Sequence, residues 1–359
     1  MSARAARLGY VWAVSNTVSA STVVLAAIRD RVAALHAAVE PDTAPPAEVV
    51  AEVEETEETD TAGDGDFGAD GGSSVTVPAA EDETPDDEPA PATGGPDEPD
   101  VERLAEALAD LEAVVTGFAP LIEGGELPAL RAELAWARST VEEVRALDGT
   151  VDVLEELLED LDPTLRQGPV EARVGIVVAA RTSERRDAVT AMLAQPEWTS
   201  LLAHADQLVL TAPIGGRKPK QTVRVLARAL ADVDATAREA ADAVVEAPDP
   251  DLASVVTAAH TVATTARVSR AVLGKQARKL ADAADALAGA LEQRRRSEAV
   301  AHWLVDLADL AHRAGEPSFT YGVLHAEAGA RRAVADEALA AAVAAYTRPK
   351  LRKGLADAA

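Results

Sequence analysis

The chain has 359 residues, enough for two or three domains of ordinary size, and a formal net charge of −27 at pH 7. The absence of cysteine excludes disulfides, thiolate catalysis and cysteine-based zinc sites. Aromatic residues make up only 3% of the sequence, which excludes a core of bulky rings, whereas the abundant alanine, leucine, arginine and glutamate favour helices.

The negative charge is concentrated in one part of the chain. Residues 40–102 contain 22 Asp or Glu and no Lys or Arg, whereas the other residues carry 39 acidic against 34 basic side chains. A uniformly acidic surface is therefore disfavoured, because the rest of the protein is nearly balanced in charge.

Residues 1–40 admit two interpretations. The uncharged run 8–28 follows MSARAAR, as in a signal peptide or membrane anchor. However, apolar residues alternate at spacings of three and four past the charges at 29–31 as far as Val39, which favours an amphipathic helix that packs on protein. We predict such a helix in a cytoplasmic protein, with a membrane anchor through residues 8–28 as the alternative. Its docking face comprises Val11, Val14, Val18, Leu25, Ile28, Val32 and Leu35.

Residues 41–100 are predicted to form a disordered acidic linker. They are rich in Pro, Gly, Asp, Glu, Ser and Thr, and include a single aromatic residue, Phe67. Too little apolar surface is available there to offset the chain entropy lost on folding. The linker serves either as a spacer or as an acidic tail that competes for basic partners.

Helical periodicity returns after residue 100. Stripes of apolar residues cover 101–122, 127–144 and 151–161, separated by Gly124-Gly125 and by the expected turn Asp148-Gly149-Thr150. Further stripes cover 223–244 and a tract from 252 to 291. Short turns between amphipathic helices imply antiparallel neighbours. We predict an all-α fold, an antiparallel bundle of coiled-coil hairpins, with a hairpin region at 101–168 and a C-terminal helical domain at 169–359.

Two β-branched stretches, 173–180 and 207–214, leave an alternative open. They could form a small β-α-β insertion. A helix from Pro169 to Ala194 is favoured for the first stretch, because two isolated strands make a poor sheet and no third strand is evident.

The stretch TAPIGGRKPKQT, residues 211–222, is a candidate anion-binding loop. Pro219 is expected to begin a helix that runs to about Val245, and the free N–H groups of a helix N-terminus suit an anion. The candidate residues are Gly215, Gly216, Arg217, Lys218, Lys220 and Arg224. No GxxxxGK[ST] or GxGxxG motif accompanies them. A solvated loop or a docking site for the acidic linker are the other interpretations.

The remaining polar clusters indicate no catalytic, metal or cofactor site. One predicted helical face carries His302, Asp306, Asp309 and His312, and we interpret it as a solvated face because Trp303, Leu304, Leu307 and Ala311 lie opposite. Two basic clusters, Arg294–Arg296 and the group Arg348, Lys350, Arg352 and Lys353, are expected near helix C-termini, where cations favour the dipole.

The sequence therefore favours a non-enzymatic helical adaptor or scaffold without cofactor. Its N-terminal helix is expected to dock on a protein partner, on a second copy or on its own body. A nucleotide- or nucleic-acid-linked regulatory protein that uses the 215–224 loop is the second hypothesis. A membrane-anchored helical protein is the third.

Overall fold

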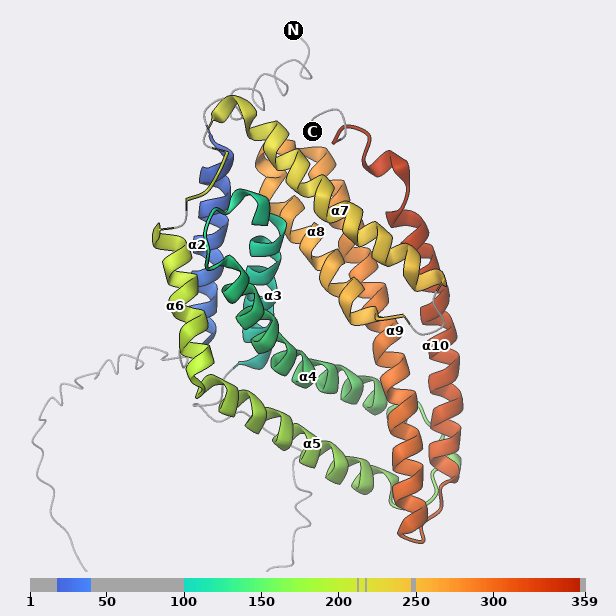
Figure 1. The fold of residues 1–359 in the computed structure, drawn as a ribbon. Helices are drawn as coiled ribbons and strands as arrows, with labels where there is room; N and C mark the ends of the chain where they lie inside the picture. The colour runs from blue at the N-terminus through green and yellow to red at the C-terminus, as the bar shows by residue number, and fades with distance from the viewer. Residues whose placement is uncertain (1–17, 40–99, 212, 217, 247–249, 356–359) are drawn as a thin grey trace, which may run out of the picture. The chain divides into compact units, whose positions relative to one another are not determined.

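The computed structural model describes residues 18–39, 100–211, 213–216, 218–246 and 250–355, and these form an all-α fold, as predicted (Figure 1). Within these residues β pairing is limited to an isolated antiparallel bridge between Ile122 and Ile214. The α-helices are α2 (Ala20–Val39), α3 (Val101–Gly117), α4 (Leu127–Glu159), α5 (Val170–Leu193), α6 (Pro196–Thr211), α7 (Thr222–Glu246), α8 (Leu252–Leu273), α9 (Lys275–Arg313) and α10 (Phe319–Tyr346). The predicted acidic linker lies outside the described residues.

Helix α2 packs into the protein's own body, mainly against α3 and α6. Ile28, Val32 and Leu35 of the predicted docking face are buried in a core that these helices share, and Leu25 packs partly against it. Val18 is half-buried just before the helix. Val11 and Val14 of the same face lie outside the described residues. The described part of this face is thus covered by the same chain.

Helix α4 continues through the turn expected at Asp148-Gly149-Thr150, so that prediction is wrong. The sequence suggested a turn because glycine disfavours helix interiors. Here Gly149 allows a close approach instead, since a β-carbon at this position would lie 2.6 Å from the Nε of Arg296 on α9. Thr150 also keeps helical geometry, with its hydroxyl donating to the Ala146 carbonyl at 2.6 Å.

The β-branched stretch 173–180 forms part of α5, and 207–211 forms the end of α6, so the favoured helix is confirmed and the β-α-β alternative is not. Helix α5 begins directly after Pro169, as expected. Helix α4 belongs to the predicted hairpin region 101–168, whereas α5 and α9 belong to the predicted domain 169–359. α4 contacts both α5 and α9, so helices of the two predicted regions pack together. No described helix combines the length and apolar character needed to cross a membrane.

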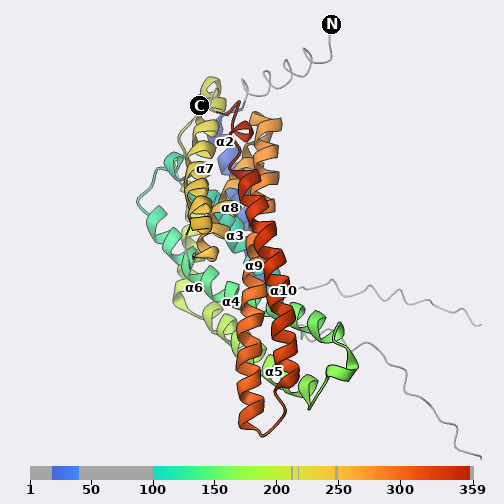
Figure 2. The ribbon, with the colours of Figure 1, turned by 90° about the vertical axis from the view of Figure 1, so that its right-hand side faces the viewer.

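Helices α7, α8, α9 and α10 follow one another in antiparallel order, as Figures 1 and 2 show. The tract expected from 252 to 291 is not continuous, because Gly274 adopts a φ of +65° and reverses the chain between α8 and α9. The N-termini of α7 and α9 therefore lie at the same end of the body as the C-termini of α8 and α10 (Figure 1).

Candidate functional site

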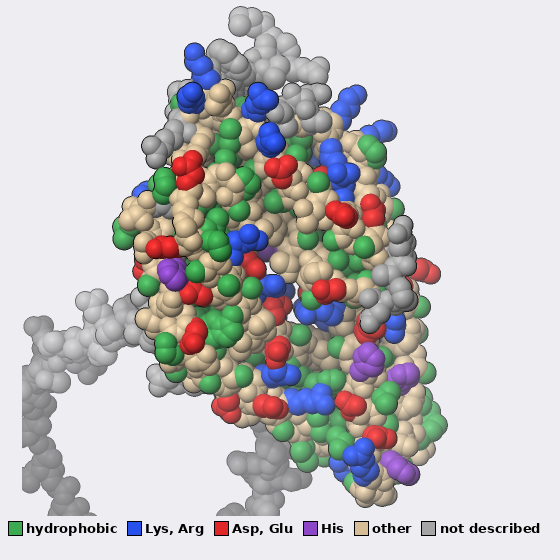
Figure 3. Space-filling model, in the orientation of Figure 1, with side chains coloured by type: hydrophobic (Ala, Val, Ile, Leu, Met, Phe, Trp, Pro, Cys, Tyr) green, Lys and Arg blue, Asp and Glu red, His purple; other side chains and the backbone are tan. Residues whose placement is uncertain are grey.

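Three segments of the chain, 218–228, 270–279 and 348–353, contain twelve Lys or Arg and no Asp or Glu. They hold all six lysines of the protein. The antiparallel order of α7 to α10 places the three segments at one end of the body, where Figure 3 shows Lys and Arg side chains gathered over the upper part of the molecule. We call this surface the basic end.

Most cations of the basic end have no ion-pair partner among the described residues. Nine of them are exposed and form no ion pair with any described residue, namely Lys218, Lys220, Arg228, Arg270, Lys275, Lys279, Arg348, Lys350 and Lys353. By contrast, arginines elsewhere are commonly paired, as Arg138 is with Glu112 at 2.5 Å and Arg173 with Glu316 at 2.6 Å. The basic end is therefore a concentrated positive surface.

The predicted anion loop forms part of the basic end but departs from the expected geometry. Gly215 donates its N–H to the Leu121 carbonyl at 2.7 Å, so this amide is already used within the fold. Gly216 has a φ of +77° and lies against Ala20, because a β-carbon would come within 3.0 Å of that side chain. Gly215 thus packs the loop on the segment after α3, and Gly216 packs it on the start of α2. Arg217 lies outside the described residues.

The start of α7 also differs from the prediction. Pro219–Gln221 form a 3-10 turn, and the α-helix begins at Thr222. The hydroxyl of Thr222 is buried and donates to the Val18 carbonyl at 2.8 Å, which ties this helix start to the chain before α2. Lys218 and Lys220 remain exposed at the helix entry, and Arg224 is exposed one turn later.

Helix α9 begins with an unusual charge arrangement. Its N-cap is Gly274, which supplies no side-chain hydrogen bond, and its first turns carry Lys275, Arg278 and Lys279 without an acidic residue. Cations oppose the positive end of a helix dipole. Helices α3 and α8 show the favourable arrangement, since Asp100 and Asp251 accept N–H bonds at their N-termini. Arg278 is compensated by Asp282 at 3.8 Å, so the unfavourable charges at the N-terminus of α9 are those of Lys275 and Lys279.

The C-terminal segment is held on the body by Arg352. Its Nε donates to Asp234 Oδ2 at 2.6 Å and its Nη2 to Asp234 Oδ1 at 2.8 Å. The neighbouring Gly354 lies beside Gln276, whose Nε2 is 3.3 Å from the position of an added β-carbon. Because Gln276 follows Lys275 in α9, this contact brings the segment with Lys353 next to the N-terminus of α9.

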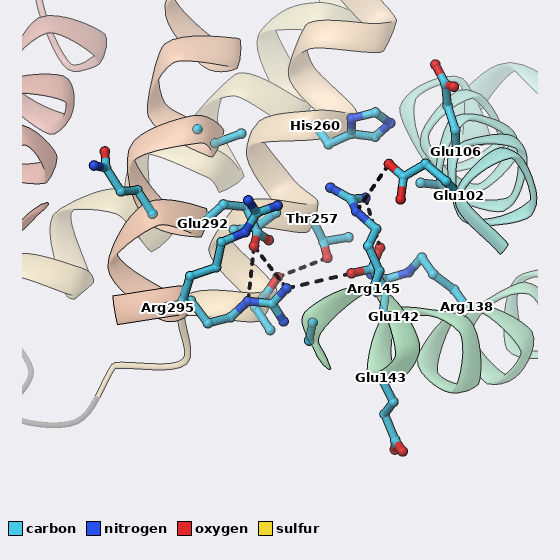
Figure 4. A pocket seen from close by; sticks show the side chains of 18 of the residues that line it. Glu102, Glu106, Arg138, Glu142, Glu143, Arg145, Thr257, His260, Glu292 and Arg295 are labelled. Atoms are coloured by element: carbon cyan, nitrogen blue, oxygen red, sulfur yellow. Dashed lines mark hydrogen bonds and ion pairs between the residues drawn. The ribbon is translucent and has the colours of Figure 1, made fainter. Parts of the chain in front are cut away.

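A cavity of about 1120 Å³ lies between α3, α4, α8, α9 and α10 (Figure 4). Its charged lining consists of Glu102, Glu106, Glu112, Glu142, Glu143, Glu156, Glu292, Arg138, Arg145, Arg295, Arg296 and Arg331, together with His260. Seven carboxylates thus face five guanidinium groups, which leaves no excess of positive charge.

The cavity arginines are engaged in ion pairs between helices. In Figure 4, Arg145 lies between Glu102 at 3.7 Å and Glu142 at 3.4 Å, while Arg295 pairs with Glu292 at 2.9 Å. Arg331 and Glu156 are 2.7 Å apart. An anion entering the cavity would have to displace these carboxylates. The cavity is consequently a charge-compensated pocket between helices.

Arg296 differs from the other cavity arginines, because no described residue forms an ion pair with it. It lies against Gly149 of α4, where the missing side chain makes room for its guanidinium. One uncompensated guanidinium among seven carboxylates still does not make the cavity attractive for a multiply charged anion.

Asp110 joins three helices close to the cavity. It accepts hydrogen bonds from His260 Nε2 at 3.1 Å and Thr264 Oγ1 at 3.3 Å, and it lies 3.3 Å from the Arg31 guanidinium. Burial by itself raises the pKa of Asp110, but the hydrogen bond and charge of His260, with the charges of Arg31 and Arg267, hold it below its usual value. Asp110 is therefore an ionised structural link between α2, α3 and α8.

The other polar clusters from the sequence do not converge on a ligand. Asp306 lies 3.5 Å from Arg181 and Asp309 lies 2.9 Å from Arg313, whereas no set of three or more potential metal ligands gathers in the described part of the chain. Arg294–Arg296 lie in the interior of α9 and not near a helix end, so that prediction is wrong.

Sequence reasoning missed several residues of the basic end. It singled out the 215–224 loop and the C-terminal cluster separately, but not Arg270, Lys275 or Lys279. The missed signal was the confinement of every lysine to three acid-free segments.

Comparison with known proteins places the chain in a family. The CHAD domain model matches residues 87–305. PptA from Streptomyces chartreusis is 19% identical, with a TM-score of 0.48, covering 67% of this chain and 88% of its own. The CHAD domain from the plant Ricinus communis is 18% identical, with a TM-score of 0.43, covering 71% and 81%. Curated proteins gave no match. Since the family model spans more than half of the sequence, the chain belongs to the CHAD domain family.

Proposed function

We propose that the protein binds an extended chain of linked phosphates, such as inorganic polyphosphate, at the basic end. One observation carries this proposal: all six lysines, from Lys218 to Lys353, gather at one end of the body in segments without a carboxylate. A lysine ammonium is a compact charge on a flexible stem, which suits contacts with phosphate oxygens of variable position.

The composition of the basic end favours a ligand recognised by charge alone. The three segments contain no aromatic residue, so bases have nothing to stack on. A nucleotide would need such a surface, whereas a polyphosphate chain would not. The cations also come from three separate segments, an arrangement that suits an extended ligand better than a compact one. The association of CHAD domains with polyphosphate binding supports the same ligand class.

The helix N-termini at the basic end support an anionic ligand as well. The start of α9 combines free backbone N–H groups with Lys275, Arg278 and Lys279. Arg278 pairs with Asp282 at 3.8 Å, but Lys275 and Lys279 repel each other and the helix dipole when no anion is bound. A bound phosphate group would neutralise that repulsion and accept the N–H groups.

The same segments favour binding without catalysis. They contain no Asp, Glu, His, Ser or Tyr, and their one hydroxyl, on Thr222, already donates to Val18. A phosphoryl-transfer site would need acidic metal ligands or a general base. The non-enzymatic adaptor role inferred from the sequence is compatible with this function and remains a separate proposal, since the described part of the docking face is covered by the chain itself.

Calorimetric titration with inorganic polyphosphate in about 0.15 M salt tests the proposal. Lys275→Gln combined with Lys279→Gln should lower the affinity by roughly tenfold and reduce the slope of log affinity against log salt by about two, as for phosphate contacts to nucleic acids. The matched control is Arg29→Gln combined with Arg131→Gln, which removes two exposed cations outside the basic end. Absence of binding by the unaltered protein, or equal losses in both double variants, overturns the proposal.

A further inference from the structure

Asp234 is a buried carboxylate that the binding surface itself does not explain. Its side chain is 5% exposed and lies on helix α7. It accepts two hydrogen bonds from Arg352 and one from the Tyr346 hydroxyl at 2.8 Å. Arg238 lies 3.5 Å from it. Replacing a buried ion pair by apolar residues is often neutral or stabilising, so stability alone gives little reason for this arrangement.

Arg352 organises the chain around it as well as neutralising Asp234. Its Nη1 donates to the carbonyls of Tyr346 at 2.8 Å and Arg348 at 3.1 Å, and its guanidinium lies over the Tyr346 ring at 5.1 Å. The side chain thereby closes the turn that carries Lys350. It is only 15% exposed, so it is poorly placed to contact a ligand itself.

The segment after Arg352 is also fixed to the body. Leu355 is buried in the core formed by α7 to α10, and Gly354 lies against Gln276 of α9. The segment with Lys350 and Lys353 is therefore anchored at two points, by Arg352, which binds Asp234 of α7, and by Leu355 in the core. The two lysines therefore belong to a segment that lies beside the cations at the start of α9.

We propose that Asp234 is a positioning residue of the basic end: by holding Arg352, it fixes Lys350 and Lys353 where they contact a polyphosphate chain together with Lys275. This inference rests on the proposed function, and it specifies which acidic residue the anion site depends on. A carboxylate that lies near an anion site would ordinarily weaken binding through repulsion. If Asp234 instead positions the lysines, removing its charge should weaken polyphosphate binding.

The experiment compares Asp234→Asn with Asp232→Asn. Asp232 lies two residues away on α7, is exposed, and forms no side-chain hydrogen bond or ion pair with a described residue. Each substitution removes one negative charge. In a polyphosphate titration, Asp232→Asn should leave the affinity unchanged or raise it slightly. Asp234→Asn should lower it by roughly tenfold, the effect expected for two lost phosphate contacts.

Two further measurements separate positioning from a general loss of structure. In a background with Lys350→Gln and Lys353→Gln, Asp234→Asn should have no further effect on affinity, because the positioned lysines are already absent. In the absence of ligand, trypsin should cleave after Lys350 and Lys353 faster in Asp234→Asn than in the unaltered protein, with the helical circular dichroism retained. If Asp234→Asn unfolds the protein, Tyr346→Phe, which removes only one hydrogen bond to Asp234, should give a smaller loss of affinity in the same direction.

The outcomes distinguish this inference from the proposed function. Lack of polyphosphate binding by the unaltered protein overturns both. If the lysine variants lose affinity but Asp234→Asn raises it as Asp232→Asn does, only the positioning role is wrong. The same conclusion follows if Asp234→Asn lowers the affinity by an equal factor with and without Lys350 and Lys353.

Discussion

Gly117, near the end of α3, lies directly against the buried hydroxyl of Thr265 on α8, so close that a β-carbon on the glycine would clash with it. This contact joins α3 to α8. The cationic segment 270–279 begins in the last turn of α8. Thr265 is fully buried, and its Oγ1 has no hydrogen-bond partner among the described residues, so the site has no spare room.

Gly117→Ala should therefore destabilise the protein by about 1–3 kcal/mol, the usual effect of overpacking a core. Gly329 provides the matched control, because it is exposed in the interior of α10 and has nothing within 4 Å of an added β-carbon. Gly329→Ala should raise the stability by about 0.5–1 kcal/mol through helix propensity. Urea unfolding of both variants checks this, and a stabilising Gly117→Ala would show that the contact is not as close as described.

The lowered pKa of Asp110 predicts a pH dependence of stability. A carboxyl whose pKa is lower in the folded state binds its proton less tightly there, so it stabilises the fold above its unfolded pKa of 3.8. That contribution is lost as the pH falls through the folded value. Between about pH 5 and the folded pKa, the unaltered protein should lose more stability than Asp110→Asn. Parallel pH curves for the two proteins would contradict the assigned role.

The cations at the start of α9 predict opposite effects on stability and binding. Lys275→Glu should raise the free energy of unfolding by about 0.3–1 kcal/mol, because an acid suits the positive end of a helix dipole. The same substitution should weaken polyphosphate binding. Lys353 does not lie at a helix N-terminus, so Lys353→Glu should weaken binding without the gain in stability. Thermal unfolding and titration of both variants test this, and a Lys275→Glu variant that binds normally would remove Lys275 from the site.

The compensated cavity predicts a negative result. Arg296→Gln removes the one cavity arginine that has no ion pair with a described residue. Because we place the ligand at the basic end, the affinity for polyphosphate should stay within about twofold of the unaltered protein, the change expected for a distant charge in salt. A loss of tenfold or more would mean that the anion enters the cavity between α3, α4, α8, α9 and α10.

The sequence predicted the fold class because helix periodicity is a local property. The apolar spacing around Ile28 and Leu35 indicated a helix, and the structure buries both side chains. Local signals failed at two glycines. Gly149 suggested a turn, but it lies within a helix and leaves room for Arg296. Gly274 lies within a continuous helical pattern of apolar residues, but the chain reverses direction there. Each outcome depends on tertiary contacts that the spacing of apolar residues does not contain.

The site was less accessible to sequence reasoning than the fold. Lys218 and Lys220 were recognisable beside glycines and a proline, whereas Lys275 and Lys279 were hidden in an apparently regular helix. Their common feature, the absence of lysine elsewhere, was present in the sequence. The role of Asp234 could not be read from the sequence, because it depends on a hydrogen bond from Arg352, which lies 118 residues further along the chain.

The proposed function requires a phosphate chain to lie on the lysines of the basic end. Acylation of lysine amines, followed residue by residue with mass spectrometry in the presence and absence of inorganic polyphosphate, tests it most directly. Saturating polyphosphate should slow the modification of Lys275, Lys279, Lys350 and Lys353 together. Unchanged modification rates at these four lysines, with the ligand shown to be bound, would contradict it.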